Sequence, residues 1–455
     1  MVLALGALAR VYHVAHGDAW HDECFTGLVS ALPAGRWIGA MLGDVHPPGW
    51  YLVSRASVAL LGANDLALRL PAMLASLAAL VLFWRVLSQL DLAPGPQLAA
   101  LTLMALSPMQ IYYAQEGRMY GALVLAAVLV AGGLALLDFR WVVAGCLLAV
   151  YLHNLGWLLF LAGLVGYAVK VKLWRDWWRP WVVPGLLALP AAGWTIYQVA
   201  HVAKGYWILD RGLGAWLYNA IYCQYLGQGL LDSRLSWAGS IVSLGLGFAG
   251  LVLAIRRRQW VWVVLAWLPG LVMLGVSQVV APMLLARTLI ISSPALYLLA
   301  GQLATTRRRQ IALVLVVAPL FFSGLYTHYA TDRRGDIGQM ADQIRAYQPA
   351  VVVESQTGAW VTLSWHMPEA QHVVWSGAAH GLSNALSDQT ADALGLRRQD
   401  LASLPRPAVI INSDYALVSP EERTNIADDL AASGARLAEV LQTDVYQRLE
   451  LWVIE

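Results

Sequence analysis

Long apolar stretches recur along the first 330 of the 455 residues, and they constrain the fold more than any other feature. A helix needs about 20 apolar residues to cross the hydrocarbon core of a bilayer. Only 13% of the residues are charged, which is about half the usual share in soluble proteins. The sequence therefore predicts an α-helical polytopic membrane protein with about 11 transmembrane helices. The stretches are 1–16, 65–84, 98–114, 118–137, 141–153, 155–170, 181–199, 236–254, 259–280, 283–304 and 310–328.

The charges between these stretches predict how the helices are oriented. Residues 1–330 carry 21 Lys and Arg, of which 12 lie in five short alternate connections. Eight of the 11 acidic residues lie in the opposite set of connections. Short cytoplasmic loops collect Lys and Arg, so we expect a cytoplasmic N-terminus and an extracytoplasmic C-terminus. The preference for Arg over Lys indicates a bacterial inner (plasma) membrane.

Two of the outer connections are much longer than the others. Residues 17–64 and 200–235 contain semi-apolar segments that Gly, Pro or charged residues interrupt. Such segments are typical of helices that lie in the membrane interface. Two further spans are the alternative, but adding one span alone would destroy the charge alternation. We expect residues 1–330 to form one transmembrane domain with interfacial helices in both long loops.

The chain changes character after residue 330. Residues 331–455 carry 9 Lys and Arg against 17 Asp and Glu, and their apolar runs are short. Runs at 350–354, 372–375, 408–412 and 446–454 are typical of strands, and 336–347 and 420–433 show helical spacing. The sequence predicts a small extracytoplasmic α/β domain over 331–455. No nucleotide-binding or nucleophile motif occurs in it, so we expect a scaffolding or acceptor-contacting role.

Polar residues in the first long loop are the first candidates for chemistry. His21, Asp22 and Glu23 follow the first apolar stretch directly. Two adjacent carboxylates at a membrane surface cost desolvation free energy unless a cation or a reacting group interacts with them. Asp44 and His46 precede two prolines, which restrict the backbone and would hold the histidine rigidly. A solvated acidic loop and a simple helix start are the alternatives for these two motifs.

Several basic residues are expected on the outer side of the membrane, where the positive-inside rule disfavours Lys and Arg. Arg69, Arg118, Arg287 and Lys204 are all expected at this depth. A guanidinium can hold a phosphate through two parallel hydrogen bonds. Pairing with Glu116 or with lipid headgroups is the alternative for any one of these arginines.

Four motifs in the first 130 residues carry a family resemblance. Trp20–Glu23, His46–Tyr51, Leu68–Pro71 and Gln115–Tyr120 follow one another in the order and spacing of the C-type membrane glycosyltransferases. The chain resembles the family 39-like branch, which includes protein O-mannosyltransferases and aminoarabinose transferases. The rest of the chain resembles that family in topology only.

This resemblance implies a function and a set of roles. Members of the family move a sugar from a polyprenyl-phosphate carrier to an acceptor hydroxyl on the extracytoplasmic face, most with inversion. Asp22 would then be the general base, and Glu23 would assist it. The implied phosphate ligands are Arg118, Arg69 and Arg287. The implied substrate-binding residues are His46, Asp44, Tyr120, Glu116 and Lys204.

Partners and rival functions follow from the same features. The resemblance implies a polyprenyl-phosphate sugar, membrane lipid and an acceptor lipid, glycan or protein as partners, with no nucleic acid. It implies no obligatory cofactor; a divalent cation held by His21, His46 and Glu23 is the alternative. A transporter or flippase for lipid-linked glycans, or a glycan polymerase or ligase, is the rival function. No feature of the sequence identifies the sugar or the acceptor.

Overall fold

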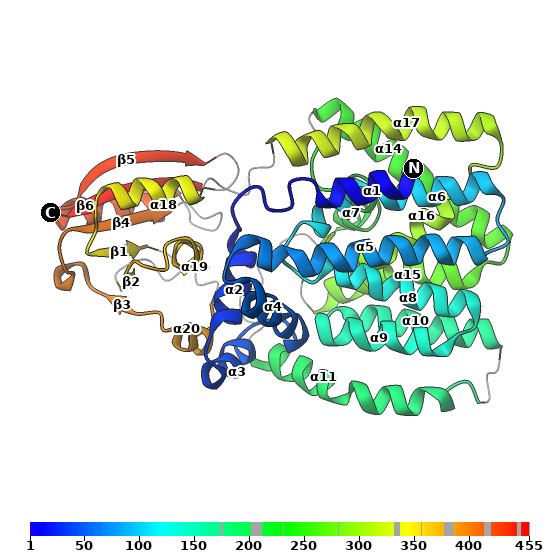
Figure 1. Ribbon diagram of the computed structural model, residues 1–455, viewed down its shortest axis with the longest axis horizontal. Helices are drawn as coiled ribbons and strands as arrows, with labels where there is room; N and C mark the ends of the chain where they lie inside the picture. Colours follow the sequence, from blue (N-terminus) through cyan, green and yellow to red (C-terminus); the bar gives the residue numbers. More distant parts are fainter. Residues whose placement is uncertain are drawn as a thin grey trace.

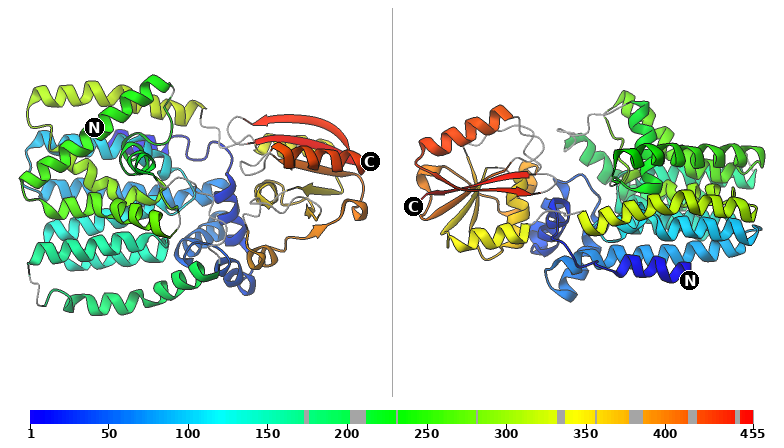
Figure 2. Two further views of the ribbon diagram at one scale, coloured as in Figure 1. Left: turned by 180° about the vertical axis from the view of Figure 1, so that it is seen from behind. Right: turned by 90° about the horizontal axis from the view of Figure 1, so that it is seen from above.

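A bundle of helices and a smaller unit built on a β-sheet make up the protein (Figure 1). The computed structural model describes residues 1–172, 176–201, 212–230, 232–280, 282–331, 337–355, 357–376, 386–413, 420–443 and 447–454. A layer of short helices lies between the bundle and the sheet, and the two remaining views in Figure 2 show the same order of layers.

Each of the eleven apolar stretches forms helix, which confirms the predicted fold class. Five helical segments are long and apolar enough to cross a membrane: 65–89, 179–201, 233–256, 260–279 and 307–330. The bundle helices are α1 (Val2–Val11), α5 (Asp65–Gln89), α6 (Pro94–Leu106), α7 (Pro108–Ala114), α8 (Tyr120–Leu136), α9 (Phe139–Leu152), α10 (Gly156–Val171), α11 (Val182–His201), α14 (Ser233–Arg256), α15 (Trp260–Val279), α16 (Ser293–Gly301) and α17 (Arg307–Tyr326). Short turns of other helix types flank three of them: η1 (Arg179–Trp181), η3 (Thr288–Ser292) and η4 (Thr327–Thr331).

The stretch at 98–114 is broken into α6 and α7, and a buried arginine stabilises the break. Pro108 cannot donate the hydrogen bond that would continue α6 and disfavours a helical conformation at the residue before it, and Ser107 is non-helical with φ −56° and ψ 128°. The carbonyls of Met104 and Ala105 then accept hydrogen bonds from the fully buried Arg10 at 3.0 and 2.7 Å. A cation at the end of a helix also interacts favourably with its dipole. Arg10 therefore ties α1 to the end of α6.

Short helices occupy both long loops. The first loop forms α2 (His21–Ala31), α3 (Ala34–Leu42) and α4 (Pro48–Leu61), which cross one end of the bundle (Figure 1). The described part of the second loop forms α12 (Leu213–Leu217), the π-helical turn η2 (Tyr218–Tyr222) and α13 (Cys223–Leu226). The chain turns between α2 and α3 at Pro33, as the interrupted apolar pattern predicts.

The C-terminal unit is a six-stranded sheet in the order β3-β2-β1-β4-β6-β5. The first four strands in this order are parallel, and β6 and β5 are antiparallel to their neighbours. Separate apolar clusters cover the two faces, one beneath α21 and one beneath α18 and α19. The strands are β1 (Val351–Glu354), β2 (His372–Trp375), β3 (Arg398–Gln399), β4 (Ala408–Ser413), β5 (Arg436–Thr443) and β6 (Gln447–Ile454). The helices are α18 (Ile337–Ala346), α19 (Thr357–His366), α20 (Asp388–Leu394), the 3₁₀ turn η5 (Leu401–Ser403) and α21 (Pro420–Ala432).

Helix α19, which the sequence pattern does not predict, joins the sheet unit to the interfacial helices. One side of it faces the sheet and the other faces α2, so it has no clear polar face. The Trp365 ring lies so close to Gly27 that a Cβ at this glycine would be 2.5 Å from it. Trp365 also donates a hydrogen bond from Nε1 to Asp65 Oδ1 at 2.9 Å. The sheet unit is thus docked on α2 and the start of α5.

Close packing of α5 on α8 predicts the effect of a small substitution. A Cβ at Gly121 would lie 2.3 Å from the carbonyl oxygen of Ala72. We expect Gly121→Ala to push the two helices apart and to cost about 1–3 kcal/mol, the usual range for overpacking. Gly185→Ala in α11 is the matched control, because no atom lies within 4 Å of a Cβ there. Thermal unfolding in nanodiscs measures both variants; equal melting temperatures would contradict the prediction.

Candidate active site

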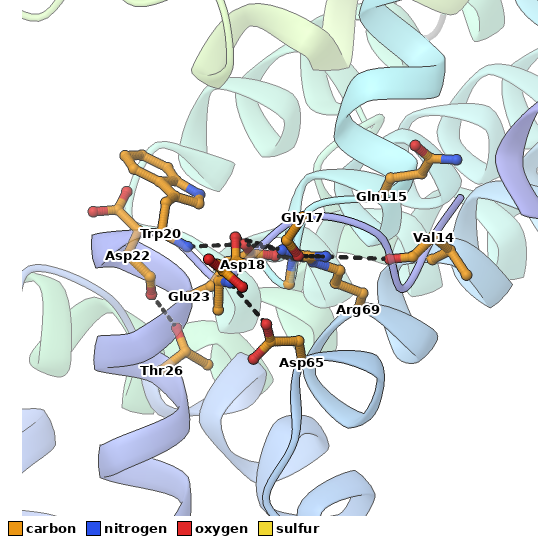
Figure 3. A network of polar contacts seen from close by, with 12 residues as sticks. Val14, Gly17, Asp18, Trp20, Asp22, Glu23, Thr26, Asp65, Arg69 and Gln115 are labelled. Carbon is orange, nitrogen blue, oxygen red and sulfur yellow. Dashed lines mark hydrogen bonds and ion pairs between the residues drawn. The ribbon is translucent and has the colours of Figure 1, made fainter. Parts of the chain in front are cut away.

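The predicted site residues that the structure describes gather at the end of the bundle covered by α2 and α4. The N-terminus of α2 supplies Asp22 and Glu23, and the turn between α7 and α8 supplies Arg118. Arg287 immediately precedes η3, and His46 lies in the turn before α4. Figure 3 shows that the side chains of Asp22 and Glu23 leave α2 in different directions. The two carboxylates therefore have different partners.

Glu23 and Arg69 form a buried ion pair. Arg69 donates from Nε to Glu23 Oε1 and from Nη2 to Oε2, both at 2.9 Å, and neither side chain is more than 1% exposed. Arg69 also donates to the backbone carbonyls of Val14, His16, Gly17 and Asp18 at 2.9–3.3 Å (Figure 3). This arrangement argues against Arg69 as a phosphate ligand.

Glu23 also accepts two backbone hydrogen bonds. The amide of Gly117 donates to Oε1 at 2.5 Å, and that of Trp20 donates to Oε2 at 3.3 Å. The second bond satisfies one of the amides left free at the start of α2. Glu23 thus joins α2, α5 and the turn that carries Arg118. This geometry suits a residue that holds these elements together and does not favour a direct part in catalysis.

Asp22 points to the other side of α2 and pairs with Arg287. Arg287 Nη1 lies 3.0 Å from Asp22 Oδ2, and these side chains are 19% and 23% exposed. The guanidinium lies between the rings of Trp20 and Tyr120, 5.9 Å from each centroid. Within the described part of the chain, no hydrogen bond reaches Asp22 Oδ1. One carboxylate oxygen is therefore held in place while the other can accept a proton.

Arg118 lies beside Asp22 with its guanidinium held by α2. Nη1 donates to Thr26 Oγ1 at 2.7 Å and lies 3.4 Å from the carbonyl oxygen of Asp22. Nη2 lies 3.2 Å from His46 Nε2. The buried Nε has no hydrogen-bond partner among the described residues. A buried donor without an acceptor is costly, so the site is poised for a group rich in acceptors.

His46 connects Arg118 to Asp44. Its Nδ1 lies 3.2 Å from Asp44 Oδ2, which also accepts a hydrogen bond from Tyr51 at 2.5 Å. Burial and the charge of Arg118 lower the pKa of His46. A neutral ring with its proton on Nδ1 can donate to Asp44 and accept from Arg118 through Nε2. Asp44 thus orients His46 and does not itself face Asp22.

The turn that carries His46 is held by side chains of the α9–α10 turn and α11. Asn154 and Gln198 donate to the carbonyls of Val45 and His46 at 2.7 and 2.9 Å. A Cβ at Gly49 would lie 2.3 Å from the carbonyl oxygen of Tyr151, so the turn lies directly against the end of α9. The histidine is therefore held from both sides.

Charged and titratable groups around Asp22, above all the two arginines, control its ionisation. Burial alone would raise the pKa of this carboxyl, but Arg287, Arg118, His21 and His46 outweigh it and lower the pKa from 3.8 to about 2. Asp22 is therefore a carboxylate at every pH near neutrality. A permanently charged carboxylate beside two arginines can take a proton only from a group that becomes strongly acidic during reaction.

The other predicted residues are distributed as follows. Tyr120 and Glu116 are buried near Arg287, and Lys204 lies outside the described residues. His21 Nδ1 lies 3.4 Å from the carbonyl oxygen of Gly358 in α19. Sequence reasoning missed Thr26, which lies four residues after Asp22 and is therefore on the same helix face. This spacing would have indicated it once α2 was assigned.

The alternative metal ligands do not come together. Glu23 is paired with Arg69, and His46 is paired with Asp44. Within the described ranges, one group of His and acidic residues is spaced to hold a cation: Asp18, Asp65 and His366. The carboxylates of Asp18 and Asp65 already accept hydrogen bonds from Gly338, Ala19 and Trp365.

Comparison with known proteins establishes the fold. The sequence matches no protein-family model and no curated protein. The structure matches crystal structures of ArnT from Cupriavidus metallidurans over 99% of this chain and 97% of that one. The TM-score is 0.62 for the apo state, at 13% identity, and 0.58 for the form bound to undecaprenyl phosphate, at 14% identity. The chain has the ArnT fold. This result confirms the C-type glycosyltransferase fold that the motifs predicted.

The buried pair predicts a large loss of stability when one charge is removed. In Glu23→Gln the shape is retained but the Arg69 guanidinium loses its counter-charge, which costs about 3–5 kcal/mol in buried pairs. Asp176→Asn is the control, because Asp176 and its partner Arg179 are 56% and 69% exposed. Exposed ion pairs contribute little to the free energy of unfolding. Unfolding in mixed micelles measures both. Similar small losses in the two variants would contradict a central role for the pair.

Proposed function

We propose that this membrane protein is a glycosyltransferase that moves a sugar from a polyprenyl-phosphate donor to an acceptor hydroxyl. The observation that carries the proposal is the Asp22 carboxylate, held through one oxygen by Arg287 beside Arg118, with its other oxygen open. ArnT, which shares the fold, was crystallised with undecaprenyl phosphate. The fold and a site suited to both a proton and a phosphate support this donor class.

The reaction is a displacement at the anomeric carbon. The acceptor oxygen forms a bond to this carbon while the bond to the phosphate oxygen breaks, and the phosphate leaves with the electron pair. Asp22 Oδ1 takes the proton of the acceptor hydroxyl. Attack from the face opposite the phosphate inverts the anomeric centre. A base with a pKa of about 2 is sufficient, because the hydroxyl becomes strongly acidic only as its oxygen bonds to carbon.

Arginines supply the charge that the leaving group needs. Negative charge grows on the phosphate as the bond breaks, and cations fixed in advance stabilise it best. We assign Arg118 as the principal phosphate ligand, with its orphan Nε as an available donor. Arg287 contacts Asp22 and can bridge the base and the phosphate. The reaction scheme routes no step through a metal.

The site belongs on the extracytoplasmic face of a bacterial inner membrane in this proposal. The α5–α6 and α16–α17 connections and the end of α10 lie at the end of the bundle opposite to α2 (Figure 1). Arg85, Lys170, Lys172 and Arg307–Arg309 lie on or beside these segments. Short cytoplasmic loops are rich in such residues, so the sheet unit and the site face outwards.

A transporter is the rival that this geometry favours less. Transporters place their ionisable residues near the middle of the membrane, in discontinuous helices. Here Asp22, Arg118, Arg287 and His46 lie together at one end of the bundle, between the helices and a docked sheet. A polymerase or ligase acting on lipid-linked glycans would share this donor chemistry and differ in its acceptor.

The test of the proposed base compares wild type with Asp22→Asn in nanodiscs. Each protein is given a panel of polyprenyl-phosphate sugars, and release of polyprenyl phosphate is followed. We expect wild type to release it from one sugar and the variant to lose at least about 100-fold in rate, the usual contribution of a general base. Donor binding by the variant is the control for folding. Near-wild-type turnover by Asp22→Asn would remove the assignment.

Removal of the Arg118 guanidinium is expected to act on the donor. Arg118→Ala should weaken binding of polyprenyl phosphate by at least about tenfold, because hydrogen bonds to charged groups contribute about 1.5–3 kcal/mol. Arg36→Ala is the control, since Arg36 is an exposed arginine in the neighbouring α3. Equilibrium binding of the lipid measures both variants. Unchanged affinity in Arg118→Ala would assign the phosphate to another cation.

A further inference from the structure

A second histidine, His153, lies at the site. In the sequence it is only the last residue of the fifth apolar stretch, 141–153. His153 occupies the break between α9 and α10 and is 6% exposed. Its ring meets that of His46 edge-on, with centroids 5.0 Å apart, and lies 6.3 Å from that of Tyr120. His46 contacts Arg118, and Tyr120 contacts Arg287. His153 is therefore a neighbour of both proposed phosphate ligands.

One contact determines where the proton of His153 is. The backbone amide of Leu155 donates to Nδ1 at 2.9 Å, so this nitrogen carries a lone pair. The neutral ring then has its hydrogen on Nε2. A second proton is disfavoured, because the cationic Arg118 and Arg287 are close. His153 is a neutral ring whose Nε2–H is a hydrogen-bond donor.

The Nε2–H group of His153 lacks an acceptor among the residues that the structure describes. Across the described ranges, Nε2 of His153 takes part in no hydrogen bond. A largely buried donor that lacks an acceptor costs free energy. The donors of Arg118 lie nearby, including its orphan Nε. Two neighbouring donors that lack an acceptor among the described residues, His153 Nε2–H and Arg118 Nε–H, favour a ligand that offers more than one acceptor oxygen.

We propose that His153 binds the phosphate of the lipid-linked donor through Nε2–H. This inference rests on the donor class proposed above and adds a ligand that lies in no motif of the sequence. A phosphate offers enough oxygens for Arg118 and His153 together. A neutral donor can contact the phosphate without adding another positive charge beside Asp22. The second role of the residue is to hold the turn before α10, by accepting the hydrogen bond of the Leu155 amide through Nδ1.

Two substitutions separate these roles. In His153→Asn, the amide oxygen can still accept from Leu155, but no donor reaches the position of Nε2. In His153→Gln, the longer amide reaches that position but does not satisfy Leu155 as well. A phosphate ligand requires the donor, so the Gln variant should bind better than the Asn variant. If His153 only held the turn before α10 through the Leu155 amide, the opposite order would be expected.

The experiment measures binding of polyprenyl phosphate without a sugar to the full-length protein in nanodiscs. We expect His153→Asn to weaken binding by at least about tenfold and His153→Gln to keep most of the affinity. Polyprenol without phosphate should bind all proteins equally. His16→Asn, at an exposed histidine, controls for the substitution. Wild-type affinity in His153→Asn, or weaker binding by Gln than by Asn, would overturn the inference. Failure of wild type itself to bind polyprenyl phosphate would instead overturn the proposed donor class.

Discussion

The ion pair between Glu23 and Arg69 is the interaction on which the rest of the site depends. It is buried between α2, α5 and the α7–α8 turn, and Glu23 holds the amide of Gly117 next to Arg118. A buried pair is stable only when its remaining hydrogen-bonding groups are satisfied. Here Arg69 meets this condition through four backbone carbonyls. The pair thus sets where α2 begins, and with it the position of Asp22.

Charge is arranged around Asp22 in two layers. Arg287 and Arg118 keep the carboxylate ionised, and Arg118 Nε has no acceptor among the described residues. Behind them, Asp44 and Tyr51 hold His46, and the turn between α9 and α10 supports the same loop. The cations therefore serve both halves of the proposed reaction, since they hold the base and receive the leaving group.

The sheet unit contributes to the site by contact and is not a separate appendage. Its α19 packs on α2, and its Gly358 carbonyl lies 3.4 Å from His21, the residue before Asp22. Because α19 is covered on one side by the sheet and on the other by α2, its sequence has no polar face. A pattern search that relies on amphipathic spacing cannot find such a helix. The edge strand β5 was not predicted because its apolar residues come in two adjacent pairs, 437–438 and 440–441, and so do not show the alternation typical of a strand.

The sequence by itself determined the membrane fold, the apolar stretches that form its helices and most of the residues that gather at one end of the bundle, but not Thr26 or His153. Hydrophobicity over about 20 residues is a local property, and so is the run of strand-type residues in the C-terminal unit. Tertiary structure decided which carboxylate meets which arginine. Asp22 and Glu23 are adjacent, but successive residues of a helix point about 100° apart, so one faces Arg287 and the other faces Arg69. Those partners lie 265 and 46 residues away along the chain, and only helix packing brings them within hydrogen-bonding distance.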